Sequence, residues 1–203
     1  MTKRGRRQAG YTAVELMMAI SIFGIGVAGI ISMEKVTSVS NAHAKNLALA
    51  SHIAESWLDN LSAEATMWNY PATGNSTSDL AIDTLWLRNV NTTQDAAANW
   101  FLPVYSTALL FGPAFDATGN PVNATINPGA VAFCSHLRLS WLYQPGQDGN
   151  GLIRAEVRVF WLRNGQTFAG SFCAAGTEAQ INGNTGTFHF VQKITAIREN
   201  TNK

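Results

Sequence analysis

The hydrophobic pattern of this chain is dominated by one uncharged run near its beginning. Leu16 to Met33 is 18 residues long, carries no charge and is rich in Ile, Leu, Val, Met and Phe. A run of this length is typical of a helix that crosses a bilayer. We therefore expect residues 11–33 to form an apolar, membrane-spanning helix.

The helical pattern continues past the apolar run as an amphipathic segment, residues 34–65. Its apolar residues recur at steps of three and four, which predicts a helix with one apolar face packed on a sheet. They are Val36, Val39, Leu47, Ala50, Ile53, Ala54, Trp57, Leu58 and Leu61. Gly24, Gly26 and Gly29 lie in the apolar half. They leave two interpretations open: local bending or melting of the helix, or close approach of neighbouring helices.

Residues 66–130 show weak periodicity and many turn-forming residues, and they predict an irregular connecting region with short elements. Large aromatic side chains are frequent in it. They serve either to pack this region onto a sheet or to contact another subunit.

Alternating apolar and polar residues predict an antiparallel β-sheet domain over residues 131–203. We expect strands near 134–143, 152–163, 166–173 and 187–198. The Asn164-Gly165 pair predicts a tight hairpin between the second and third strands. The expected fold class is α+β: a long N-terminal helix, transmembrane in its first half, packed on an antiparallel sheet.

Cys134 and Cys173 are the two cysteines of the chain. With regular hairpins they would stand about 19 Å apart, too far for a disulfide. Three alternatives remain: the register slips or bulges, the third strand leaves the sheet early, or the thiols stay apart. We treat Cys134 and Cys173 as a possible disulfide.

Charge helps to set topology and excludes one class of partner. The chain has 14 basic and 13 acidic side chains, and without Lys3, Arg4, Arg6 and Arg7 the count becomes 10 against 13. Scattered cations of this kind do not form a nucleic-acid-binding surface, so we predict no direct nucleic-acid binding. The four cations before the apolar run predict a cytoplasmic N-terminus.

Glu15 is the one charged residue at the start of the apolar helix, where a carboxylate is costly in a membrane. A harmless position at the headgroups, near a helix N-terminus, is one interpretation. The other interpretation is that Glu15 has a function, because a buried carboxylate is tolerated when it pairs with an opposite charge.

A basic leader, Gly10, an aromatic residue at Tyr11, Thr12 and Glu15 precede the long apolar helix. This arrangement resembles the class III signal peptide of type IV prepilins and pseudopilins, the type IV pilin-like family. Tyr11 replaces the usual phenylalanine. The resemblance implies that prepilin peptidase cuts between Gly10 and Tyr11, removes residues 1–10 and methylates the new N-terminus. It also implies that Glu15 pairs with the amino group of a neighbouring subunit during assembly.

No motif of a catalytic or metal site occurs in the sequence. His43 and His52 lack a third ligand, and Asp116, Asp148 and Glu156 have no partner that spacing identifies. We therefore predict no enzyme, no cofactor and no metal site.

The resemblance implies the fold of a type IV pilin and the function of a minor pilin that primes assembly of a pilus or sits at its tip. Pili of this kind serve motility and adhesion. The expected partners are prepilin peptidase, the major pilin, other minor pilins, the inner-membrane assembly platform and, before assembly, lipid. The protein would span the inner membrane once, with its C-terminal domain in the periplasm, and then move to the pilus.

Three alternatives remain. The nearest is a pseudopilin of a type II secretion system. A second is a Sec-secreted soluble β-domain that binds a ligand, with a cleavage site at Ala42, His43 and Ala44. A third is a plain single-pass anchor that keeps Gly10 uncut.

Overall fold

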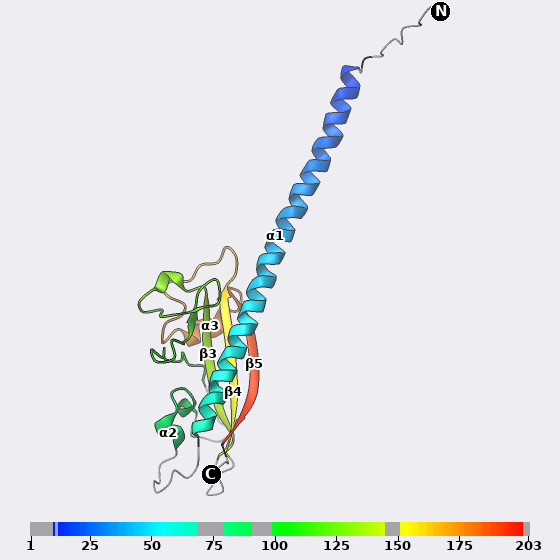
Figure 1. Ribbon diagram of the computed structural model, residues 1–203. Coiled ribbons are helices and arrows are strands. Elements are labelled where there is room, and N and C mark those ends of the chain that lie inside the picture. The colour runs from blue at the N-terminus through cyan, green and yellow to red at the C-terminus, as the bar shows by residue number, and fades with distance from the viewer. Residues whose placement is uncertain (1–9, 11, 69–78, 91–98, 145–150, 201–203) are drawn as a thin grey trace, which may run out of the picture. The chain divides into compact units, whose positions relative to one another are not determined.

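The computed structural model describes residues 10, 12–68, 79–90, 99–144 and 151–200 (Figure 1). The chain divides into two compact units, Met1–Asn46 and Leu47–Lys203. The longest helix, α1 (Ala13–Glu64), begins in the first unit and ends in the second. The expected long N-terminal helix is therefore present.

In the first unit, α1 continues without a break through Gly24, Gly26 and Gly29. A Cβ atom at any of the three would have no neighbour within 4 Å. Ser21, Ser32 and Thr37 donate their hydroxyls to backbone carbonyls one turn earlier, at 2.8–2.9 Å. These three hydroxyls are therefore hydrogen-bonded within the helix.

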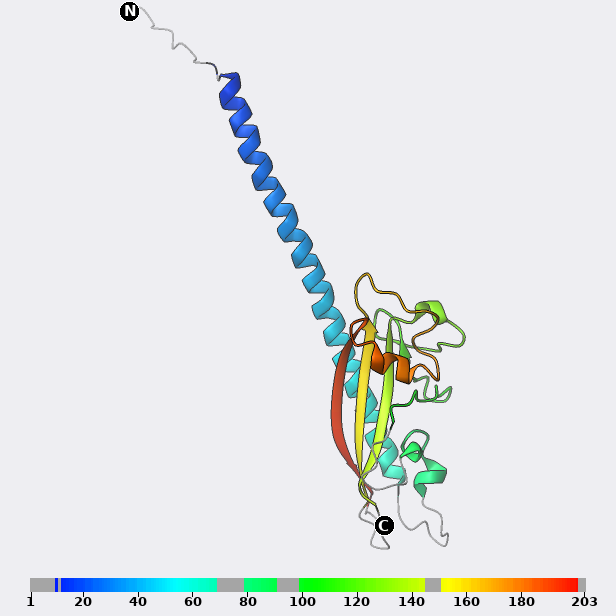
Figure 2. The ribbon, with the colours of Figure 1, turned by 180° about the vertical axis from the view of Figure 1, so that it is seen from behind.

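The second unit is built on an antiparallel sheet of five strands in the order β2-β1-β3-β4-β5. The long strands β3, β4 and β5 lie side by side, and the last turns of α1 cover one face of them (Figures 1 and 2). The strands are β1 (Ala114–Phe115), β2 (Pro121–Val122), β3 (Phe133–Tyr143), β4 (Leu152–Leu162) and β5 (Phe188–Arg198). This arrangement confirms the predicted α+β class.

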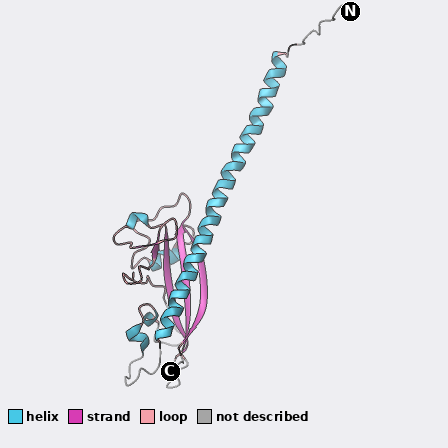
Figure 3. Ribbon diagram, in the orientation of Figure 1, coloured by secondary structure: helices cyan, strands magenta, loops and turns pink. Residues whose placement is uncertain are grey.

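Short helical elements sit in the connecting segments (Figure 3). They are the 3₁₀ helices η1 (Ala65–Met67), η2 (Leu87–Asn89) and η3 (Pro128–Ala130) and the short α-helices α2 (Asp79–Asp83) and α3 (Glu178–Gly183). The predicted connecting region also supplies β1 and β2, which are too short to show an alternating sequence pattern.

The predicted third strand at 166–173 and its hairpin are wrong. The chain leaves the sheet after β4, where the Gln166 N–H donates to the carbonyl of Arg163 at 3.0 Å and closes a turn. The strand that pairs with β4 is β5, along eleven residues from Leu162 opposite Phe188 to Leu152 opposite Arg198. The prediction failed because the Asn164-Gly165 turn signal is local, whereas β5, a longer strand farther along the chain, pairs with β4 instead.

The two faces of the sheet bury different cores. Odd-numbered residues of β4, including Val157 and Trp161, pack with Ile53, Trp57 and Leu61 of α1. The opposite face buries a smaller cluster: Ala114, Cys134, Phe160, Cys173, Ile181 and Phe188. The period-two pattern of the strands thus serves two apolar layers rather than one.

Cys134 and Cys173 form a disulfide in the smaller core, with their Cα atoms 5.5 Å apart. The wide separation expected from the sequence depended on a strand at 166–173. Because that segment leaves the sheet, it folds back over the face on which Cys134 lies.

Reduction of this disulfide is expected to destabilise the folded protein. The bond closes a loop between residues 39 apart in sequence, which corresponds to about 4 kcal/mol of loop-closure entropy. Thermal unfolding of the full chain in detergent, with and without a thiol reductant, measures the effect. A double variant, Cys134→Ala with Cys173→Ala, is the control and should no longer respond to reductant. Equal melting of oxidised and reduced wild type would contradict the prediction.

Glu64 is the last residue of α1, and its buried carboxylate accepts hydrogen bonds from a later segment of the chain. It accepts the backbone N–H groups of Leu85, Trp86 and Leu87, at 2.8–3.1 Å. These groups precede or begin η2, so the carboxylate caps that short helix.

Glu64→Ala is expected to reduce the free energy of unfolding by about 3–5 kcal/mol, because buried N–H groups would lose a charged acceptor. Chemical denaturation of the full chain in detergent measures the loss. Glu55→Ala is the matched control: Glu55 lies on the same helix, is more than half exposed and pairs with Lys193. A surface pair of that kind should change stability by at most about 1 kcal/mol. Equal losses for the two variants would contradict the role of Glu64.

Candidate functional site

The first turn of α1 is capped by Thr12. The Thr12 hydroxyl accepts the Glu15 N–H at 3.3 Å, and the Thr12 carbonyl accepts the Leu16 N–H at 3.2 Å. Thr12 is therefore the N-cap, and Glu15 is the third residue of the helix. This local geometry places Glu15 in the first turn of α1.

Gly10 and Glu15 are both exposed. A Cβ at Gly10 would meet nothing within 4 Å, so the backbone there is open to approach. Among the described residues, no hydrogen bond or ion pair reaches the Glu15 carboxylate. Tyr11 lies outside the described residues. Of the predicted processing and assembly residues, the structure thus describes Gly10 and Glu15, both accessible from outside the chain.

The helix that follows has an apolar surface on all sides. Large apolar side chains between Val14 and Met33 expose 59–76% of their surface, with Val27 partly covered. Burying eleven such side chains is worth on the order of 15–30 kcal/mol. A helix that is apolar all round is stable only when lipid or other helices cover it.

Within the described residues, Ala13–Met67 is the one helix long and apolar enough to cross a membrane. Its apolar half lies near the N-terminus. Together with the capped first turn, this makes residues 10–33 the candidate site for membrane insertion and for contacts with other helices.

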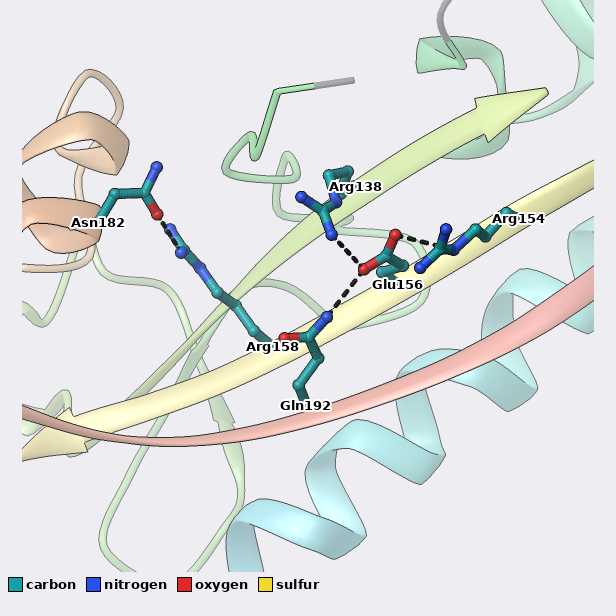
Figure 4. A network of polar contacts seen from close by, with 6 residues as sticks. All are labelled: Arg138, Arg154, Glu156, Arg158, Asn182 and Gln192. Carbon is teal, nitrogen blue, oxygen red and sulfur yellow. Dashed lines mark hydrogen bonds and ion pairs between the residues drawn. The ribbon is translucent and has the colours of Figure 1, made fainter. Parts of the chain in front are cut away.

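Apart from the N-terminal site, a cluster of polar side chains lies on the sheet face opposite α1 (Figure 4). Glu156 of β4 is 3% exposed, and its carboxylate binds Arg138 of β3, Arg154 at 3.0 Å and Gln192 of β5 at 2.8 Å. Both carboxylate oxygens are engaged. The cluster therefore ties three strands together. The sequence pattern could not identify Arg138 and Gln192 as partners, because they lie on other strands than Glu156.

Arg158 lies on the same face and is also buried, at 6% exposed. Its guanidinium donates to Asn182 of α3 and, at 2.8 Å, to Nδ1 of His136. Trp100 stacks over it, with the ring centroid 4.4 Å from the guanidinium carbon. Burial lowers the pKa of Arg158 to about 10, which leaves it charged at neutral pH.

His136 must be neutral to accept this bond. Burial and, next, the charge of Arg158 lower its pKa to about 3 from 6.5. The unfolded state then binds more protons between these two pKa values, so stability is complete above pH 6.5 and falls as the pH drops toward 3.

The His136 pKa shift predicts a loss of up to about 1.4 kcal/mol of stability per pH unit below 6.5. His136→Gln retains an acceptor but does not titrate. Its stability should therefore decline less steeply than that of the wild type between pH 6 and 4.5, measured by denaturant unfolding at each pH. Parallel declines would show that His136 is not the group responsible.

The described residues contain no group of three or more His, Cys, Asp or Glu side chains placed to hold a metal ion. Asp116 is engaged locally: its carboxylate accepts the Thr118 hydroxyl and the Asn120 N–H. These contacts lower its pKa to about 2. Asp148 lies outside the described residues.

The sequence from residue 5 to residue 31 matches the family model of the prokaryotic N-terminal methylation motif. The match covers the end of the leader, Gly10, Glu15 and most of the apolar run. Comparison of the chain with curated proteins found no match, and comparison with solved structures found none. The methylation motif and the exposed apolar helix therefore mark the same segment.

Proposed function

We propose that this chain, a type IV pilin-like protein by its N-terminal methylation motif, is a minor pilin of a type IV pilus. In this role it is a structural subunit that helps prime filament assembly or sits at the filament tip. The observation that carries the proposal is an exposed apolar helix with a lone carboxylate in its capped first turn, within the methylation motif. Such a helix needs a cover, and a filament core supplies one.

The motif implies processing by a prepilin peptidase, and the apolar helix implies membrane anchoring. We propose that the N-terminus lies in the cytoplasm and the C-terminal domain in the periplasm of the inner membrane. Cleavage between Gly10 and Tyr11 removes residues 1–10, and methylation follows. The apolar helix then moves from lipid into a core formed by the major pilin and other minor pilins, on the inner-membrane assembly platform.

Glu15 has a defined task in this proposal. Cleavage creates an α-amino group four residues before it, and the amino group of an adjacent subunit neutralises the carboxylate. A charge pair inside an apolar core stabilises only one register of helix against helix, because any other register leaves a charge without a partner.

The role is mechanical rather than catalytic. The Glu156 carboxylate is occupied by three side chains and ties strands together. We propose that the sheet domain is a rigid body that α1 carries, and that no reaction takes place on it.

Counting copies of the protein per filament tests the minor-pilin assignment. Quantitative mass spectrometry of sheared filaments should find far fewer copies of this chain than of the main subunit, and deletion of its gene should reduce the number of filaments. Abundance equal to that of the main subunit would refute the assignment. Loss of protein secretion with filaments unchanged would favour a pseudopilin of a type II secretion system, which needs the same N-terminal motif.

A further inference from the structure

Residues 107–110 form a tight turn that presents two leucines to solvent; we call it the leucine turn. Ser106 and Phe111 close it with two backbone hydrogen bonds, at 2.8 and 3.2 Å. Leu109 is 56% exposed and Leu110 68% exposed. A tip of this kind normally carries polar residues.

Leu110 is also strained. Its φ is +50°, which makes it the one non-glycine residue with positive φ in the described parts of the chain. Asparagine or glycine adopts this left-handed conformation more readily than leucine. The turn thus breaks two local rules at once, and such conflicts cluster at functional positions.

The turn is held rigidly at its base. The Phe111 ring packs against Trp57 and Phe115, at centroid distances of 4.8 and 5.6 Å. The Leu109 N–H donates to the Ser106 hydroxyl at 3.2 Å. A Cβ at Gly112 would lie 2.4 Å from the Tyr105 ring, so the chain can pass there only as glycine. The leucines therefore cannot easily collapse onto their own domain.

From this geometry we propose that the leucine turn is a docking tip, which inserts Leu109 and Leu110 into an apolar pocket of a neighbouring pilin-type subunit. The proposal rests on the filament role given above, which supplies the neighbour. A preorganised pair of leucines loses little entropy on binding. Burying their exposed surface would strengthen association by about a hundredfold.

Charge favours a protein over a membrane as the occupant. Residues 99–115 contain no charged side chain. Segments that bind a membrane surface usually add Lys or Arg to their apolar residues, for attraction to anionic lipid. Two leucines without cations are better suited to a small protein pocket.

The test combines incorporation, stability and crosslinking of the full chain in cells. The double variant Leu109→Ser with Leu110→Asn should be recovered in sheared filaments at least about tenfold less than the wild type. Leu110→Asn alone should raise Tm by about 2–4 °C, because it relieves strain. Ile194→Thr is the matched control: Ile194 is 53% exposed on β5, and its variant should incorporate normally. Benzoylphenylalanine in place of Leu109 should crosslink to one pilin-type subunit, and in place of Ile194 it should not.

Recovery of the double variant in filaments at the wild-type level would overturn the docking-tip proposal and leave the proposed function standing. A lower Tm for Leu110→Asn would assign the turn to folding, and crosslinks to lipid would assign it to the membrane; either result overturns the proposal. Absence of the wild-type chain from filaments would refute the proposed function instead. The crosslink would then decide the docking tip: a single pilin-type partner supports it, and no partner overturns it.

Discussion

Gly10→Leu is expected to stop removal of residues 1–10, so that the full-length precursor accumulates. A peptidase must fit the backbone of the scissile bond closely, and glycine allows the closest approach. In this chain a Cβ at Gly10 has no neighbour within 4 Å, so the substitution should leave the protein's own fold intact. The expected block therefore arises in the enzyme complex and not from misfolding.

Intact mass of the protein, produced with an active prepilin peptidase, measures the effect of Gly10→Leu. Gly5→Leu places the same side chain at the other glycine of the leader and should be processed normally. Normal cleavage of the Gly10 variant would show that the processing site lies elsewhere.

Glu15→Val is expected to be processed normally and to be incorporated into filaments at least about 100-fold less than the wild type. Removing one partner of a buried charge pair costs about 3–5 kcal/mol, because the amino group of the neighbour stays buried without a counter-charge. Within the described residues the Glu15 carboxylate has no intramolecular ion pair, so the variant should keep the stability of the sheet domain.

Two readouts separate processing from assembly for this variant. Intact mass reports cleavage, and quantitative recovery in sheared filaments reports incorporation. Glu34→Gln is the matched control, since Glu34 lies on the same helix just beyond the apolar run. Wild-type incorporation of Glu15→Val would refute its role in setting the register.

The sequence predicted the elements whose patterns are long. The uncharged run from Leu16 and the amphipathic segment after it predicted one helix, and α1 extends from Ala13 to Glu64. The alternation at Leu137, Leu139 and Trp141 predicted β3 correctly, and the same period predicted β4. These patterns are local, because the apolar residues of β3 and β4 that pack with α1 alternate along each strand with residues of the opposite face, many of which are polar.

What the sequence could not predict depends on pairing between distant segments. Asn164-Gly165 is a strong local turn signal, but the edge of β4 is occupied by β5, which pairs with it along eleven residues. Arg154 lies two residues before Glu156 on β4, but the partners Arg138 and Gln192 come from β3 and β5, so no spacing reveals those two. The strain at Leu110 depends on its positive φ, and the sequence Leu109-Leu110 does not predict that backbone conformation.

The candidate site divides in the same way. Gly10, Tyr11 and Glu15 were recognisable because their spacing is a short, specific motif. The cap by Thr12 also has a sequence signal, because Thr12-Ala13-Val14-Glu15 follows the T-x-x-E pattern of a helix N-terminus, and the structure shows the Glu15 N–H donating to the Thr12 hydroxyl. Nothing in the sequence suggested that Glu64 would cap η2, because the two are brought together by the fold.

The most direct test of the central claim is the N-terminus and intact mass of the mature protein, recovered from cells with an active prepilin peptidase. The pilin account predicts a chain that starts at a methylated Tyr11. A start at Lys45 would make the protein a secreted soluble domain, and an intact Met1 or Thr2 would make it a plain membrane anchor; either result would contradict the account.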